Sequence, residues 1–112
     1  MPEIREIRTE EEMRRLLDDS FASKAVLFKY SPTCGISLAV QERWEEWASS
    51  APSSVILARC DVLAARPAAR GITTWLDMLH QSPQVLVLES GKCLAHTSHY
   101  SIDAGWLEKH AG

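Results

Sequence analysis

Apolar residues along the chain follow two spacings, one typical of buried strands and one typical of amphipathic helices. Short apolar runs bounded by polar residues predict strands that are buried on both faces. Apolar residues three and four positions apart predict helices with one buried side. The predicted strands span residues 3–8, 25–30, 54–62, 84–89 and 93–99. The predicted helices span residues 9–20, a stretch that begins at Cys34, residues 64–79, and a closing stretch that begins at Ser101.

The order of these elements predicts the fold class. Strands and helices alternate through the first three strands, and a hairpin at 90–92 followed by a helix closes the chain, giving the order βαβαβαββα. Crossover helices join parallel strands, whereas a hairpin joins antiparallel ones. We therefore expect an α/β protein of the thioredoxin-like type, with a mixed sheet and helices on both faces. At 112 residues the chain has the size of a single domain, 1–112.

Two local signals bear on the helices. Thr9 followed by Glu12 is a capping-box pattern, which predicts a helix start at Thr9. Gly71 lies inside the predicted helix 64–79 and weakens that prediction, because glycine is a poor helix former. The four tryptophans fall on apolar faces of the predicted helices, and we interpret them as packing residues.

Composition narrows the classes of function. The net charge is −3, and acidic and basic residues are interleaved, so we expect neither a nucleic-acid surface nor a membrane-binding patch. The acidic start is unlike a signal peptide. Three cysteines at positions 34, 60 and 93 fit neither a disulfide framework nor a zinc site. These features predict a cytoplasmic protein without a bound metal or cofactor.

Cys34 is the first candidate for chemistry. It lies in Thr33-Cys34-Gly35-Ile36-Ser37, where a predicted strand gives way to a predicted helix. Unpaired N–H groups and the dipole at a helix start favour a thiolate, which is the reactive form of cysteine. The side chain of Thr33 and the backbone N–H groups of Gly35, Ile36 and Ser37 are candidates for binding the sulfur. The alternative is a buried core cysteine that happens to precede a helix.

Ser82-Pro83 is the second candidate feature, because prolines avoid positions that lead into a central strand. A cis peptide bond would satisfy the geometry, although an ordinary trans proline that ends the preceding helix is the commoner case. In a thioredoxin-like arrangement this loop lies against the start of the second helix, so Pro83 would face Cys34. Backbone groups beside Pro83 could then pair with a substrate. His80 lies on the same loop and would stabilise the thiolate, contact a ligand carboxylate or cap the preceding helix.

Three further residues have two interpretations each. Cys60 alternates with charged neighbours in a strand and is interpreted as core, but it would be a resolving thiol if it faced Cys34. Cys93 follows the hairpin turn and is expected to be partly exposed and remote from Cys34. Lys29 either adds positive charge near the thiolate or is a solvated lysine at a strand end, and the second interpretation is preferred.

The segments FKYSPTCGIS (28–37) and HQSPQVLVLESGKCLAHTSHYSI (80–102) resemble the monothiol bacilliredoxin family of the thioredoxin superfamily, and the likeness extends over residues 25–107. That family typically has a TCPIS-like active site and an H-x-S-P-Q-V segment. The resemblance implies that Cys34 is the nucleophile, that Ser37 replaces a resolving cysteine and that Pro83 is a cis-proline. Two departures are Gly35, where the family often has proline, and Asp77, where glycine often ends the third helix; Asp tolerates the left-handed conformation required there.

The same resemblance implies the activity and the partners. Members remove bacillithiol, a bacterial low-molecular-weight thiol, from mixed disulfides with proteins. Bacillithiol would be a thiol co-substrate, S-bacillithiolated proteins would be substrates, and a disulfide reductase would be a further partner. Ser37 cannot expel a thiol from Cys34, so a second small thiol or that reductase must complete the cycle.

Two other functions stay open at the level of sequence. The tetrapeptide Cys34-Gly35-Ile36-Ser37 also resembles the C-G-x-S of monothiol glutaredoxins, some of which carry an iron–sulfur cluster between two subunits. Alternatively, the chain is a non-catalytic thioredoxin-like binding module in which Cys34 only senses redox state. Such a module would have a Cys34 of ordinary reactivity.

Overall fold

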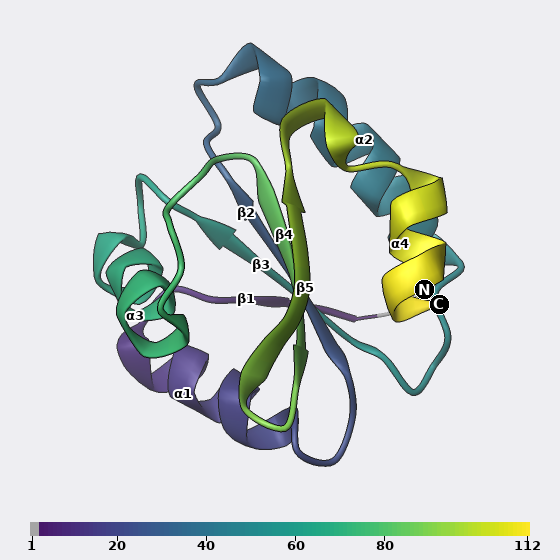
Figure 1. The fold of residues 1–112 in the computed structure, drawn as a ribbon. Coiled ribbons are helices and arrows are strands. Elements are labelled where there is room, and N and C mark those ends of the chain that lie inside the picture. Colours follow the sequence, from purple (N-terminus) through teal and green to yellow (C-terminus); the bar gives the residue numbers. More distant parts are fainter. Residues whose placement is uncertain (1–2) are drawn as a thin grey trace.

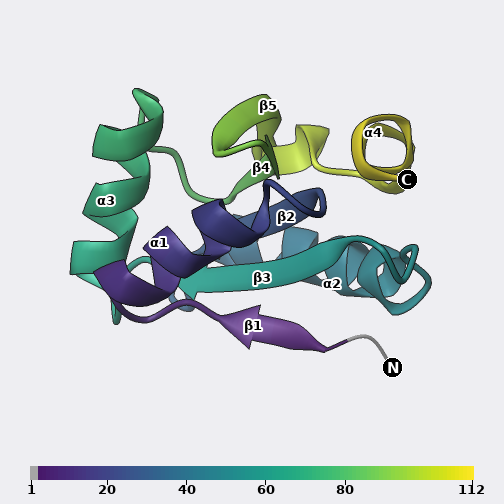
Figure 2. The same cartoon turned by 90° about the horizontal axis from the view of Figure 1, so that it is seen from below.

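A five-stranded mixed sheet forms the centre of the computed structural model, which describes residues 3–112 (Figure 1). The strands are β1 Ile4–Glu6, β2 Ala25–Tyr30, β3 Ile56–Asp61, β4 Gln84–Glu89 and β5 Lys92–Ser98. They lie in the order β1-β3-β2-β4-β5, which Figure 2 shows from one edge of the sheet to the other. β3 is parallel to β1 and β2, whereas β4 is antiparallel to β2 and β5. The predicted mixed sheet is confirmed.

Helices cover both faces of this sheet. They are α1 Glu10–Asp19, α2 Gly35–Ser49, α3 Arg66–Leu76 and α4 Ala104–Ala111, and a short 3₁₀ turn spans His99–Ser101. α1 and α3 lie on one face, and α2 and α4 lie on the other (Figure 1). This confirms the thioredoxin-like α/β class expected from the order of elements.

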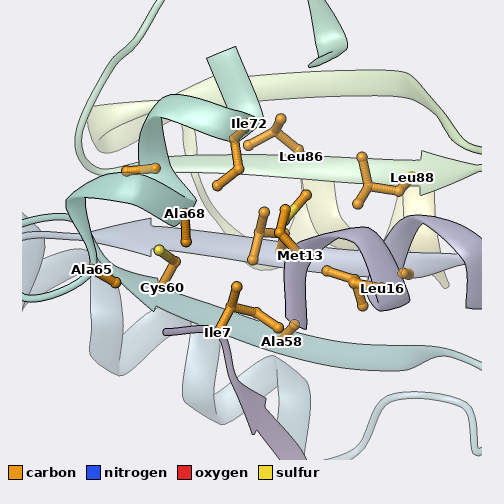
Figure 3. Packing of buried hydrophobic residues seen from close by; sticks show 13 residues of the cluster. Ile7, Met13, Leu16, Ala58, Cys60, Ala65, Ala68, Ile72, Leu86 and Leu88 are labelled. Atoms are coloured by element: carbon orange, nitrogen blue, oxygen red, sulfur yellow. The ribbon is translucent and has the colours of Figure 1, made fainter. Parts of the chain in front are cut away.

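Strand alternation divides the buried residues into two cores, because successive side chains of a strand point to opposite faces. In β2, Ala25 and Leu27 pack under α1 and α3, whereas Val26 and Phe28 pack under α2 and α4. Figure 3 shows the first core, in which the helical side chains of Met13, Leu16, Ala68 and Ile72 meet Leu86 and Leu88 of β4. In the second core the Phe28 ring stacks on Trp44, with 5.2 Å between ring centroids.

Several element boundaries differ from the predictions. β1 is shorter than 3–8 because its register with β3 covers Ile4–Glu6, with one further hydrogen bond from the Ile7 N–H to the Arg59 carbonyl. α3 runs through Gly71 and ends at Leu76, and its C-cap is Asp77, whose φ of 51° is left-handed, as the sequence allowed. α4 begins at Ala104 rather than near residue 101, because Asp103 caps it by accepting a hydrogen bond from the Trp106 N–H.

Burial of the tryptophans also differs in part from the prediction. Trp44 and Trp47 are buried under the sheet face that α2 covers, as expected. Trp75 and Trp106 are only half-buried and pack at the margins of the two cores. Ala39, which the helical spacing placed with the buried residues of α2, is exposed.

Candidate thiol site at the start of α2

Cys34 is the N-cap residue of α2 and is partly exposed. Its backbone is extended, with φ −96° and ψ 121°, and the helix begins at Gly35. The Cys34 N–H donates to the Ser31 carbonyl at 3.2 Å, and the Cys34 carbonyl accepts from the Leu38 N–H at 3.2 Å. These bonds fix the thiol at the end of the helix where N–H groups lack intrahelical partners. The alternative of a buried core cysteine is wrong.

The helix start lowers the pKa of the Cys34 thiol. The largest cause is the backbone N–H of Ser37, and the backbone N–H of Ile36 and the Ser37 side chain act in the same direction. Partial desolvation opposes them by raising the pKa. Donors aimed at the sulfur stabilise the charged form, so the thiolate is favoured relative to an ordinary cysteine.

Ser37 takes part in the hydrogen bonding of the loop that precedes α2. Its side chain is fully buried, and its hydroxyl oxygen accepts a hydrogen bond from the Ser31 N–H at 3.2 Å. A hydroxyl group can accept and donate at the same time, so the Ser37 hydroxyl can also donate its hydrogen to the Cys34 sulfur. Thr33 is exposed instead, and its hydroxyl pairs with the Ser31 hydroxyl at 3.2 Å.

Gly35 departs from the TCPIS pattern without a steric cause in this fold. A Cβ atom at this position would meet no atom within 4 Å outside the adjacent residues and the backbone of the same helix. Gly35 is the first helical residue, where a backbone N–H has no intrahelical partner and where proline is also well tolerated. The glycine is therefore compatible with the same loop geometry that a proline would give.

The peptide bond between Ser82 and Pro83 is cis, as the resemblance implied. Pro83 is buried, and its carbonyl accepts a hydrogen bond from the His99 N–H at 3.0 Å. Pro83 has no N–H of its own and its carbonyl accepts from His99, so the backbone groups of Ser82 are the adjacent candidates for pairing with a substrate. The Ser82 hydroxyl oxygen is buried and has no hydrogen-bond partner among the described residues.

Lys29 is not the solvated strand-end lysine that the sequence suggested. It is only 1% exposed, and its ammonium group lies 2.9 Å from Gln84 Oε1 and 3.0 Å from His80 Nδ1. It shares the α1/α3 face of β2 with Ala25 and Leu27, at the end of the strand. Burial lowers the pKa of Lys29 to about 8, and the neighbouring Cys60 opposes this shift.

His80 contacts Lys29 rather than a helix end. α3 ends in the left-handed backbone of Asp77, so His80 is not its cap. Burial and, to a lesser extent, the charge of Lys29 lower the pKa of His80. The groups that lower the pKa of Cys34 all belong to Ile36 and Ser37. Through Lys29, His80 holds the loop before Pro83, and its exposed ring can contact a ligand.

The other two cysteines lie away from the start of α2. Cys60 is fully buried beside Ala65 and Ala68 under α1 and α3 (Figure 3), and burial raises its pKa to about 11. Cys93 is half-buried against the same core, and burial likewise raises its pKa to about 11. The interpretation of Cys60 as a core residue is confirmed. All three thiols are free, and only that of Cys34 has a lowered pKa.

Two other kinds of feature are absent from residues 3–112. No three or more His, Cys, Asp or Glu side chains in this range are grouped so that they could hold a metal ion. Within the same range, no helix combines the length and the apolar character needed to cross a membrane.

The fold and the site together define a class of protein. This protein combines the strand order of a thioredoxin fold with a cis-proline loop and one cysteine of lowered pKa just before α2. These features define a thioredoxin-fold thiol-redox protein with a single cysteine at that position. The model of the family described as monothiol bacilliredoxin BrxC matches residues 5–107. The chain therefore belongs to the monothiol bacilliredoxin family.

Solved structures confirm the fold. A protein described as a putative oxidoreductase with a thioredoxin fold superposes with a TM-score of 0.85 at 16% identity, covering 97% of this chain and 94% of its own. Thioredoxin of Fasciola hepatica has a TM-score of 0.76 at 19% identity and covers 94% and 93%. Thioredoxin of Trypanosoma brucei brucei has a TM-score of 0.77 at 20% identity and covers 97% and 88%.

Proposed function

We propose that this protein is a thiol-disulfide oxidoreductase that removes bacillithiol from protein mixed disulfides by a monothiol mechanism at Cys34. The observation that carries the proposal is the contrast among the three thiols. Cys34 is partly exposed and has a lowered pKa, whereas burial raises the pKa of Cys60 and Cys93. Membership of the monothiol bacilliredoxin family supports bacillithiol as the small thiol.

In the first half-reaction the Cys34 thiolate attacks the bacillithiol sulfur of the mixed disulfide. A new disulfide forms between Cys34 and bacillithiol, and the bond to the substrate protein breaks. The substrate cysteine leaves as a thiolate and takes up a proton from water. The N–H groups of Ile36 and Ser37 and the Ser37 hydroxyl lower the pKa of Cys34 and so favour the attacking thiolate. The backbone of Ser82 is the candidate partner for the substrate chain.

The second half-reaction needs an external thiol. Ser37 stands where a dithiol protein would have its second cysteine, and a hydroxyl cannot form the disulfide that would release bacillithiol. A second bacillithiol thiolate attacks the sulfur of the bound bacillithiol, which frees the Cys34 thiolate and forms bacillithiol disulfide. A disulfide reductase that returns this disulfide to the thiol would complete the cycle.

The direct test is reduction of a purified bacillithiol–protein mixed disulfide by the wild type and by C34S, C60S and C93S. We expect activity to be lost only in C34S, and mass spectrometry of the wild type to find one bacillithiol on Cys34 after a single turnover. No reduction by the wild type, under conditions in which a known exchanger is active, would overturn the proposal. It would favour a binding module or, if anaerobically purified protein absorbed visible light, a cluster carrier.

A further inference from the structure

An open cavity of about 430 Å³ lies between α3 and the loop that leads to Pro83. Its polar lining consists of Arg66, Arg70, Thr73, Thr74 and His80. Every one of these side chains can donate a hydrogen bond, and no carboxylate lines the cavity. The volume falls within the range typical of small-molecule sites.

The two arginines carry positive charge that no ion pair among the described residues neutralises. Arg66 and Arg70 are one helical turn apart on α3, and both are exposed. The ion pairs among residues 3–112 involve Arg5, Arg15 and Arg59, and neither cavity arginine takes part in one. A guanidinium group binds a carboxylate in a bidentate manner, so the pair suits a ligand with carboxylate groups.

The contact with Lys29 determines which ring nitrogen of His80 carries the proton. A lysine ammonium group only donates, so His80 Nδ1, at 3.0 Å from Lys29 Nζ, must accept. The ring proton of the neutral imidazole then resides on Nε2. His80 is exposed and lines the cavity, so its Nε2–H is a donor free for a ligand.

The cavity lies at the carboxyl ends of β2 and β3, where the segment from Tyr30 to Cys34 begins. Val62, which forms part of the cavity wall, donates its N–H to the carbonyl of Tyr30 at 2.9 Å. Tyr30 ends β2, and the chain continues from there to Cys34. On the other side, His80 belongs to the loop that ends at Pro83. A ligand whose sulfur lies at Cys34 could therefore extend along this loop towards the arginines.

We propose that this cavity is a carboxylate-binding subsite, in which Arg66, Arg70 and His80 hold the anionic part of the small thiol that Cys34 takes over. The inference rests on the proposed function, because it assigns the part of the small thiol remote from its sulfur. The apolar wall formed by Val62 and Ala69 would pack against the carbon skeleton of the ligand. The subsite determines which small thiols are accepted and takes no part in the exchange of disulfides.

The test compares two protein mixed disulfides that differ only in the small thiol. One carries mercaptosuccinate, which has two carboxylates, and the other carries 2-mercaptoethanol, which has none. We expect the ratio of kcat/KM for the first over the second to fall about tenfold in the double variant R66Q/R70Q, since a hydrogen bond between charged groups contributes about 1.5 kcal/mol. R8Q/R15Q removes two exposed arginines elsewhere and should keep the wild-type ratio. An unchanged ratio in R66Q/R70Q would overturn the subsite while exchange itself persists.

A binding measurement separates failure of the subsite from failure of the proposed function. Titration of the C34S protein with succinate, followed by NMR, needs no catalysis. We expect the backbone amide signals of Thr73, Thr74 and His80 to shift with succinate, and R66Q/R70Q in the same background to abolish the shifts. Shifts at these positions would support the subsite even if the protein exchanged no disulfide. Absence of shifts in the C34S protein would overturn it.

Discussion

At the scale of single residues, Lys29 is the least expected feature of the structure. A lysine that is 1% exposed, in the second strand of the chain, links the Gln84 side chain to the His80 ring. Gln84 follows Pro83 directly, and its Nε2 group also donates to the Leu79 carbonyl at 3.4 Å. The chain thus uses one buried cation to tie both ends of the cis-proline loop to β2.

Lys29 predicts a specific dependence of stability on pH. Its pKa falls from 10.5 in the unfolded chain to about 8 in the fold, so burying the charge costs up to about 3 kcal/mol below pH 8. Between pH 8 and 10.5 the folded protein has released this proton and the unfolded chain still holds it. The free energy of unfolding contributed by Lys29 therefore rises with pH in that window and is constant outside it.

Denaturant unfolding of the wild type and K29M across pH 7–11 measures this effect as the difference between the two proteins. The raised pKa values of Cys60 and Cys93 act in the opposite direction, since stability falls as pH rises towards 11. Taking the difference between wild type and K29M largely removes these thiol contributions. K92M, which removes an exposed lysine, controls for the loss of one charge. A difference that stays flat with pH would contradict a buried ammonium group at position 29.

At the scale of elements, the start of α2 provides the groups that activate Cys34. The residue before the helix carries the thiol, and the first turn supplies the donors from Ile36 and Ser37. The first turn contains no acidic side chain that would repel a thiolate. By contrast, α1 begins at a capping box between Thr9 and Glu12 with three acidic residues in its first turn, as is usual for a structural helix start.

The Ser37 hydroxyl yields a prediction about this helix start. In S37A the pKa of Cys34 should rise, because one donor to the thiolate is lost, but it should remain below its ordinary value, because the N–H groups of Ile36 and Ser37 persist. Alkylation of Cys34 by iodoacetamide at acidic to neutral pH should therefore slow, with its pH profile moved to higher pH. S31A removes a neighbouring hydroxyl that pairs with Thr33 and should leave the profile in place. Identical profiles for S37A and wild type would assign the whole effect to the backbone.

At the scale of the whole molecule, the fold gives three chemically identical residues different environments. Cys34 lies at the start of α2, whereas Cys60 and Cys93 pack with the core under α1 and α3. Reactivity requires both the thiolate form and access to the reagent. The tertiary structure therefore confines thiol chemistry to one position, even though the chain contains three free cysteines.

This separation predicts the order of alkylation in the native protein. Cys34 should react first, Cys93 more slowly, and fully buried Cys60 only as the protein unfolds, because its access requires opening of the core. Mass spectrometry of proteolytic peptides after timed alkylation would report the three rates separately. In denaturant the three rates should converge. Modification of Cys60 at the rate of Cys34 in the native protein would contradict the burial described above.

The order of elements, the mixed sheet and the position of Cys34 at a helix start could all be predicted from the residues along the chain. These features depend on hydrophobic periodicity and helix capping, and both involve residues that are close along the chain. Segments β2 and β4 were predicted with their observed bounds for the same reason. The family resemblance came from two segments whose residues are also close along the chain, and it included the cis state of the Ser82–Pro83 bond.

The places where side chains from distant segments meet follow from the packing of the folded chain and could not be predicted from local patterns. Lys29, His80 and Gln84 lie up to 55 positions apart, and only the antiparallel pairing of β2 with β4 brings them together. The same holds for the burial of Cys60 and for the cavity between α3 and the cis-proline loop. A lysine, a histidine and two arginines have no periodic signature, because their roles depend on contacts across the fold and not on spacing along the chain.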